Sequence, residues 1–190
     1  MGIKYSFVYF APVDKLGPIH RHKAVFLDRD GVLNEERGQH TYRLEDFIIR
    51  PGVPEALRLL KASGYYLVVI TNQSGIARGM YTREQMQACH NYLHEVTDYV
   101  IDAVYYSPYH ESITRSLGRK PGTLLFERAL ARFLIKPELS WMIGDKDRDL
   151  VPAHQLGIQT LMMGDATSTI PTNYRAHSME DAANVILALG

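Results

Sequence analysis

The stretch KAVFLDRDG, residues 23–31, decides the fold that we expect for this chain. It opens with an almost continuous apolar run, which is typical of a strand buried on both faces of a parallel sheet. Asp28 and Asp30 follow the run at once, and Gly31 suits a chain that leaves the sheet in a sharp turn. In open parallel sheets, ligands bind in the crevice beyond the carboxyl ends of the strands. The stretch therefore predicts a sheet and a site at its edge.

Short apolar runs and amphipathic stretches alternate through the rest of the sequence. Besides 23–28, we expect strands at 65–71, 102–107, 139–145 and 159–163. We expect helices at 51–64, 82–96, 122–134, 149–157 and 179–189. Thr82 and Gln85 form a capping-box pattern at the start of the second helix. With right-handed crossovers, this alternation predicts an α/β fold with a doubly wound parallel sheet.

The composition is that of an ordinary globular protein. At 190 residues, with 46% hydrophobic and 22% charged residues, the chain can bury one core, and disorder is not expected. We find no linker or repeat, so we expect one domain over 23–190, preceded by an N-terminal extension over 1–22. The 21 basic and 21 acidic residues give zero formal charge, which argues against a nucleic-acid partner.

The sequence also limits the compartment and the partners that we expect. The single Cys89 excludes an internal disulfide framework and is compatible with the cytoplasm. No apolar run approaches the length of a membrane span, and the N-terminus lacks the apolar segment and cleavage site of a signal peptide. We therefore expect a cytoplasmic protein without a membrane partner, as a monomer or a weak homo-oligomer.

A second acidic cluster, GDKDRD at 144–149, follows another expected strand. Asp145 is placed like Asp28, whereas Asp149 lies at the start of the next helix and has an alternative role as its N-cap. Acids in Asp-x-Asp-Gly can also be solvated turn residues. Carboxylates that converge repel one another unless a cation lies between them, and oxygen ligands favour Mg²⁺. The two clusters together predict a magnesium site.

The segment TNQSG at 71–75 and the pair Arg119-Lys120 supply groups that suit an anion. The Thr71 hydroxyl and the backbone N–H groups after it match phosphate oxygens. Arg119 and Lys120 would neutralise the phosphate charge, although such a pair is also common on a solvated surface. The sequence contains neither a P-loop nor a G-x-S-x-G motif, so NTPase and serine-hydrolase chemistry have no support.

Taken in order, these elements resemble the motifs of the haloacid-dehalogenase-like phosphohydrolases, over roughly residues 23–189. More narrowly, the chain is similar to the D-glycero-D-manno-heptose bisphosphate phosphatases and histidinol phosphatases. That similarity is carried by FLDRDGVLN, RPGVPEAL, ITNQSGIARG, GRKPG and IGDKDRDL. The resemblance implies a Rossmann-like core, and the absence of a large insertion predicts a site without a cap domain. It also implies a Mg²⁺-dependent phosphomonoesterase that acts on a small phosphate ester.

The resemblance implies a role for each candidate residue. Asp28 matches the nucleophile that becomes an aspartyl phosphate, and Asp30 matches the general acid and base. The residues that match the phosphate- and substrate-binding positions are Thr71, Asn72, Arg119 and Lys120. The residues that match the metal-binding positions are Asp28, Asp30, Asp145 and Asp149, with Asp30 acting through its backbone carbonyl.

One family feature is missing from this chain. Members of this type carry a zinc loop before Arg-Lys-Pro, with the pattern Cys-x-His, a spacer and Cys-x-Cys. The residues aligned with its four ligands are Ser107, Tyr109, Ser116 and Gly118. We therefore expect no structural zinc, and a loop that is either held by packing and hydrogen bonds or mobile.

The loop borders the expected site, so the departure leaves several substrates open. We expect a heptose phosphate or bisphosphate first, and histidinol phosphate or a range of small metabolites second. A nucleic-acid 3′-end phosphatase is a further alternative, although the neutral charge argues against it. A non-catalytic phosphate-binding relative ranks last, because Asp28 and Asp30 are both present.

Overall fold

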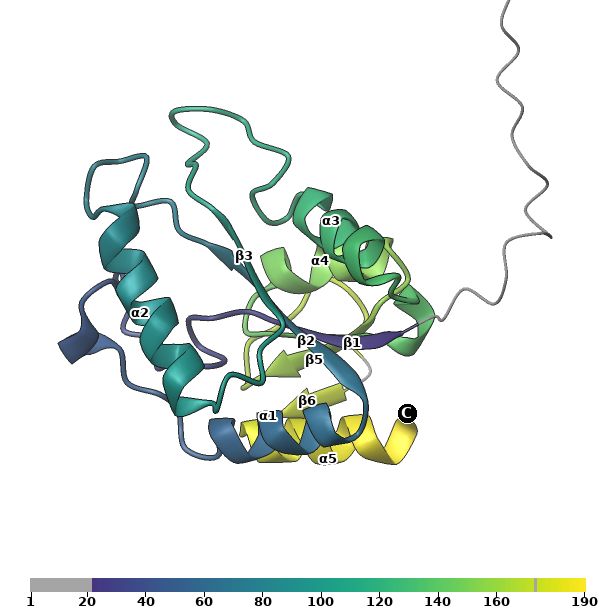
Figure 1. Ribbon diagram of the computed structural model, residues 1–190. Helices are drawn as coiled ribbons and strands as arrows, with labels where there is room; N and C mark the ends of the chain where they lie inside the picture. The colour runs from purple at the N-terminus through teal and green to yellow at the C-terminus, as the bar shows by residue number, and fades with distance from the viewer. Residues whose placement is uncertain (1–21, 173) are drawn as a thin grey trace, which may run out of the picture.

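The computed structural model describes residues 22–172 and 174–190 (Figure 1). Its strands are β1 (Lys23–Leu27), β2 (Tyr65–Asn72), β3 (Ala103–Ser107), β4 (Trp141–Gly144), β5 (Gln159–Met163) and β6 (Tyr174–Ala176). They form one sheet in the order β3-β2-β1-β4-β5-β6, and every pairing is parallel. The expected extension over 1–22 lies outside the described residues, apart from His22.

Five α-helices cover the sheet on both faces (Figure 1). They are α1 (Val53–Ala62), α2 (Arg83–Val96), α3 (Leu124–Phe133), α4 (Asp147–Gln155) and α5 (Met179–Leu189). Helices α1, α2 and α5 pack on one face, and α3 and α4 pack on the other. Two 3-10 turns add Leu44–Asp46 and Pro137–Leu139. This arrangement confirms the doubly wound α/β fold.

The apolar run of β1 explains why the sheet has helices on both sides. Val25 and Leu27 belong to the core beneath α1 and α5, whereas Ala24 and Phe26 belong to the core beneath α3 and α4. All four side chains have no exposed surface, because successive residues of a strand point to opposite faces. A strand with one solvated face would have shown polar alternation instead.

Most expected elements are confirmed, with two differences. The capping box at Thr82 is formed: its Oγ1 accepts from the Gln85 N–H, and the Gln85 side chain accepts from the Thr82 N–H. Strand β6 was not expected, because its three residues are too few to show a pattern. Helix α4 begins at Asp147 rather than at 149, so Asp149 lies within the first turn and is not the N-cap.

The strand order places the switch point of the sheet between β1 and β4. The chain winds outward from β1 to β3 and then returns to β4 on the other side of β1. The loops after β1 and β4 therefore diverge and leave a crevice between them, where ligands bind in such folds. Asp28 follows β1 and Asp145 follows β4, so both acids lie at this crevice.

The connections above the crevice consist of loops and one 3-10 turn. Between β1 and α1 the chain forms loops and the turn Leu44–Asp46, and between β3 and α3 it forms a single loop. Neither connection contains a separate folded unit, which confirms the expectation of an uncapped core. Within the described residues, no helix combines the length and hydrophobicity that crossing a membrane requires.

Candidate active site

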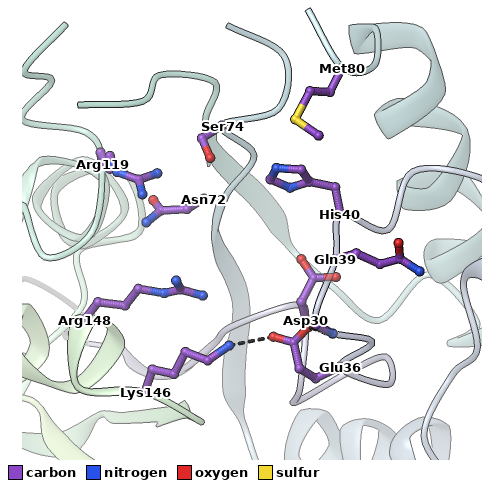
Figure 2. Close-up of a pocket in the computed structure, with 11 residues that line it drawn as sticks. Asp30, Glu36, Gln39, His40, Asn72, Ser74, Met80, Arg119, Lys146 and Arg148 are labelled. Carbon is purple, nitrogen blue, oxygen red and sulfur yellow. Dashed lines mark hydrogen bonds and ion pairs between the residues drawn. The ribbon is translucent and has the colours of Figure 1, made fainter. Parts of the chain in front are cut away.

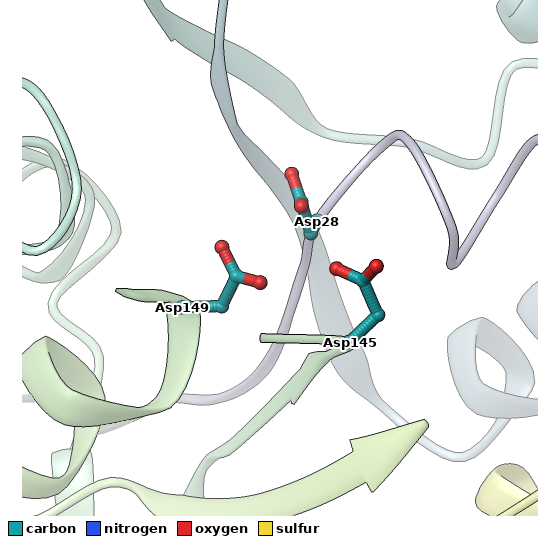
Figure 3. A group of neighbouring side chains, drawn as sticks. All are labelled: Asp28, Asp145 and Asp149. Atoms are coloured by element: carbon teal, nitrogen blue, oxygen red, sulfur yellow. The ribbon is translucent and has the colours of Figure 1, made fainter. Parts of the chain in front are cut away.

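Three carboxylates meet at the crevice between β1 and β4 (Figure 3). Asp28, Asp145 and Asp149 each offer an oxygen, and these three oxygens lie within 4.8 Å of one another. Asp145 Oδ1 is buried and has no hydrogen-bond partner in the described residues, so it is free to bind a cation. The cluster is the kind of donor set that hard divalent cations prefer, and it fits Mg²⁺.

Gly31 allows this approach of the two loops. It adopts a φ of 86°, and a Cβ atom at this position would lie 2.6 Å from Asp145 Oδ2. A larger residue would push Asp145 away from the other carboxylates. Burial and the neighbouring charge of Asp28 raise the pKa of Asp145 above its ordinary value, as expected for acids brought together without a cation.

Lys120 supplies a positive charge inside the cluster. Its Nζ lies 2.8 Å from Asp28 Oδ1 and 2.7 Å from Asp149 Oδ1, and it donates to the carbonyl oxygen of Ile70 at 2.6 Å. Burial disfavours the charge, but the two carboxylates raise the pKa of Lys120, so it remains an ammonium. Burial and the charge of Asp149 raise the pKa of Asp28 to about 6, against the attraction of Lys120.

Asp30 lies beside the cluster and is held by several donors. Arg29 donates to it from Nη2 at 2.8 Å and from Nε at 3.2 Å, and Asn34 donates from Nδ2 at 3.0 Å. Although burial opposes ionisation, these contacts with Arg29 lower the pKa of Asp30 below the ordinary value of an aspartate. The acid role expected for Asp30 requires a raised pKa, which the negative charge of a bound phosphate ester would favour.

The phosphate-binding candidates lie at the ends of β2 and of the loop after β3. Thr71 is buried, and its Oγ1 accepts from the Gln73 side chain at 2.9 Å. Asn72 binds the backbone of Lys120 through two hydrogen bonds of 3.0 Å: its Nδ2 donates to the Lys120 carbonyl oxygen, and its Oδ1 accepts from the Lys120 N–H. Asn72 thus contacts the backbone of Lys120 directly, and Thr71 precedes Asn72 at the end of β2.

A cavity of about 470 Å³ opens beside Asp30 (Figure 2). Figure 2 shows Arg119, Arg148 and Lys146 on one side of it, facing Asp30 and Glu36. Lys146 Nζ forms an ion pair of 2.5 Å with Glu36. Arg119 and Arg148 form no ion pair with any carboxylate of the described residues, so the wall has cationic groups available for an anion.

Sequence reasoning missed several residues of the site. They are Arg29, Asn34, Glu36, Gln73, Lys146 and Arg148. Four of them lie in motifs that the sequence did single out, DRDG, TNQSG and GDKDRD, where they stood between the residues of interest. The position of these four residues next to a strand end is the sequence signal that could have identified them as residues of the site.

The loop that lacks the zinc ligands is hydrogen bonded. His110 closes a turn through its carbonyl oxygen, which accepts from the N–H of Ile113 at 2.9 Å and of Thr114 at 3.0 Å. The carbonyl oxygen of Pro108 accepts from Ala77 N–H at 3.1 Å. The Pro108 contact connects the loop to the segment after β2, the His110 contacts lie within the loop, and all three are of the kind that the first of the two expected alternatives requires.

Comparisons with known proteins agree with this geometry. Residues 117–183 match a family model described as HAD-hydrolase-like. The D-glycero-beta-D-manno-heptose-1,7-bisphosphate 7-phosphatase of Haemophilus ducreyi is 39% identical over 74% of this chain and 82% of its own length. The enzyme of the same name from Pasteurella multocida is 34% identical over 88% of this chain and 98% of its own length.

A solved structure matches the fold. It is the D,D-heptose 1,7-bisphosphate phosphatase of B. bronchiseptica, solved with magnesium and phosphate. The two structures superimpose with a TM-score of 0.80 at 24% identity, over 88% of this chain and 99% of the other. At that level of identity, the match supports the architecture alone.

Proposed function

The chain belongs to the haloacid-dehalogenase-like phosphatases, in the family of the D-glycero-D-manno-heptose-1,7-bisphosphate 7-phosphatases, and we propose that it removes a phosphate from a phosphorylated heptose. The observation that carries this proposal is that Asp28, Lys120 and the carboxylate cluster lie together beside a cavity, and that the two guanidinium groups lining this cavity form no ion pair within the described residues. The same group of residues provides a nucleophile, a counter-charge for phosphate and room for the rest of a sugar.

The proposed reaction proceeds in two steps on the chain's own residues. An oxygen of Asp28 attacks phosphorus, the bond from phosphorus to the sugar oxygen breaks, and Asp30 gives that oxygen a proton. Asp30 then takes a proton from a water molecule, which attacks the aspartyl phosphate and regenerates Asp28. Lys120 and Thr71 hold the phosphoryl oxygens throughout and offset their charge.

Mg²⁺ is the cation that the carboxylate cluster is proposed to hold. Asp28, Asp145 and the backbone carbonyl of Asp30 would bind it directly, and Asp149 would support them. The bound ion would contribute charge stabilisation at the phosphoryl group. The proposal includes no structural zinc, because the aligned loop positions carry no cysteine or histidine.

Removal of divalent metal is expected to abolish turnover and leave the fold intact. Without the ion, Asp145 Oδ1 has no partner in the described residues, and the repulsion between the carboxylates is offset by Lys120 and, at 3.3 Å from Asp145, by Lys146. We expect phosphate release to stop in excess EDTA and to return when Mg²⁺ is restored, with an unchanged circular dichroism spectrum. Undiminished turnover in EDTA would contradict the magnesium site, and one zinc per chain in elemental analysis would contradict the proposed loop.

Arg119 and Arg148 favour a substrate that carries a second anionic group. Both line the cavity, and neither is neutralised by a carboxylate in the described part of the chain. A planar guanidinium binds a phosphate through two parallel hydrogen bonds, which a neutral sugar hydroxyl does not reproduce. A heptose bisphosphate offers the second phosphate that this wall would bind, whereas histidinol phosphate offers an ammonium group at that end.

A phosphate-release screen tests the substrate. We expect kcat/KM to be highest for D-glycero-D-manno-heptose 1,7-bisphosphate, about tenfold above the heptose monophosphate, because a hydrogen bond to a charged group contributes a net free energy of about 1.5–3 kcal/mol. Histidinol phosphate and a 3′-phosphorylated oligonucleotide are expected to rank below both. A clear preference for either of these two would replace the heptose proposal.

Arg148→Met tests whether the guanidinium binds the second phosphate, and Arg132→Met is its matched control. Arg148→Met keeps an unbranched apolar side chain and removes the guanidinium, so the preference for the bisphosphate should shrink through a higher KM while kcat stays close to the wild-type value. Arg132→Met, on the exposed part of α3, should leave the preference unchanged. An equal loss with bisphosphate and monophosphate in Arg148→Met would show that the guanidinium does not bind the second phosphate.

A further inference from the structure

We propose that Tyr81 and Gln73 form a positioning pair, in which Tyr81 fixes the amide of Gln73 so that Gln73 aligns Asp30 with Thr71. This inference rests on the proposed function, because it gives Asp30 the acid role and Thr71 the phosphate role. Neither Tyr81 nor Gln73 is needed to explain the metal-binding carboxylates or the cationic wall.

The amide of Gln73 joins the two functional side chains. Its Nε2 donates to Thr71 Oγ1 at 2.9 Å and lies 3.3 Å from Asp30 Oδ2, to which it also donates. Gln73 is 1% exposed, so water does not compete for these contacts. Because the Thr71 oxygen accepts from Gln73, its own hydrogen is available to donate to a phosphate oxygen. One amide group therefore sets both the place of the acid and the direction of the hydroxyl.

Tyr81 decides which way this amide points. Its hydroxyl donates to Gln73 Oε1 at 2.7 Å, so the nitrogen end of the amide must face Asp30. Burial raises the pKa of Tyr81 to about 12, so the phenol keeps the proton that it donates. A reversed amide would turn Oε1 toward the Asp30 carboxylate, so that two acceptors would face each other and Asp30 would keep only its donors on Arg29 and Asn34.

The ring of Tyr81 is itself fixed from two sides. Tyr42 stacks on it with ring centres 4.9 Å apart and planes inclined by 7°, and His40, which lines the cavity, packs at 5.6 Å. Gly75 leaves the room that the ring needs, since a Cβ there would lie 2.1 Å from Tyr81 Cε1. Tyr81 thus packs against His40, which lines the substrate cavity, and binds Gln73, which contacts the acid Asp30.

Tyr81→Phe tests the pair, because it keeps the stacked ring and removes only the hydroxyl. Two substrates separate a role at the acid from a general loss of structure. D-glycero-D-manno-heptose 1,7-bisphosphate has an alkoxide leaving group that needs a proton, whereas p-nitrophenyl phosphate has a leaving group that departs without one. The quantity to compare is kcat/KM, which includes the transfer to Asp28 but not the later hydrolysis of the aspartyl phosphate.

We expect Tyr81→Phe to lower kcat/KM about tenfold for the heptose ester and less than about threefold for p-nitrophenyl phosphate. The loss with the heptose ester is about what the removal of one oriented hydrogen bond costs. Tyr42→Phe keeps the other ring of the stack and should match the wild type with both esters. Equal losses with both esters in Tyr81→Phe would overturn the inference. Wild-type protein inactive with both esters would instead overturn the proposed function.

A double-mutant cycle adds a second, independent measurement. Gln73→Met removes the amide at similar length, and after that change the hydroxyl of Tyr81 has no amide left to orient. Adding Tyr81→Phe to Gln73→Met should therefore cost no further activity with the heptose ester. Additive losses in the double variant would show that Tyr81 does not act through Gln73, and unchanged activity in Gln73→Met would overturn the pair altogether.

Discussion

Asp28→Asn will lower kcat by roughly ten-thousand-fold or more, because it removes the nucleophile while the binding groups around it remain. An amide has neither the negative charge nor the basicity that attack on phosphorus requires. The variant should fold, since Lys120 keeps its contact with Asp149 and with the carbonyl of Ile70. The measurement is phosphate release, together with trapping of a phosphorylated chain in the wild type and its absence in the variant.

Asp147→Asn is the matched control for this experiment. Asp147 lies two residues from Asp145 in sequence, but its carboxylate accepts hydrogen bonds from Ser168 and Thr169, away from the cluster. It should retain wild-type turnover within a factor of about two, since surface substitutions away from a site have small effects. Near-normal turnover in Asp28→Asn would assign the nucleophile to another group.

The sequence predicted the elements of this fold better than its side-chain contacts. The continuous apolar run before Asp28 required a strand with two buried faces, and that requirement alone led to helices on both sides of the sheet. The rule that ligands bind beyond the carboxyl ends of parallel strands predicts that Asp28 and Asp145 lie at one crevice. Strand β6 could not be predicted, because three residues on one edge carry too little pattern.

The contacts of the site could not be predicted because they depend on packing across distant segments. Arg29 looks like a spacer in DRDG, yet its side chain is fully buried and donates to the carbonyl oxygen of Thr41. Gln73 looks like a turn residue, yet its amide connects the ends of β1 and β2. Nothing in the local sequence gives the direction of such side chains, which the neighbouring loops impose.

Lys120→Met will destabilise the fold by about 3–5 kcal/mol, because it leaves two buried carboxylates without their counter-charge. Asp28 and Asp149 are 3% and 0% exposed, so water cannot replace the ammonium. The variant should also lose turnover, since phosphate would enter a site that is already negative. Urea unfolding in the presence of EDTA, compared with the wild type under the same conditions, measures the loss of stability.

The destabilisation should depend on pH in a definite direction. Burial and the charge of Asp149 raise the pKa of Asp28 in the folded chain, and removal of Lys120 raises it further, whereas in the unfolded chain it returns to its ordinary value. The folded variant then binds more protons than the unfolded one, so its stability relative to the wild type falls as pH rises above the ordinary carboxyl range. The deficit should be smaller near pH 5 than near pH 8. An equal deficit at both values would indicate lost packing rather than unpaired charge.

Two further variants separate the charge effect from the loss of a long side chain. Adding Asp149→Asn to Lys120→Met removes one of the repelling charges, so the double variant should recover part of the lost stability. Lys61→Met removes a lysine that contacts Asp102 at 2.6 Å at a half-exposed position, and such a pair is expected to contribute no more than about 1 kcal/mol. If the double variant is less stable than Lys120→Met alone, the carboxylates are not what the ammonium holds together.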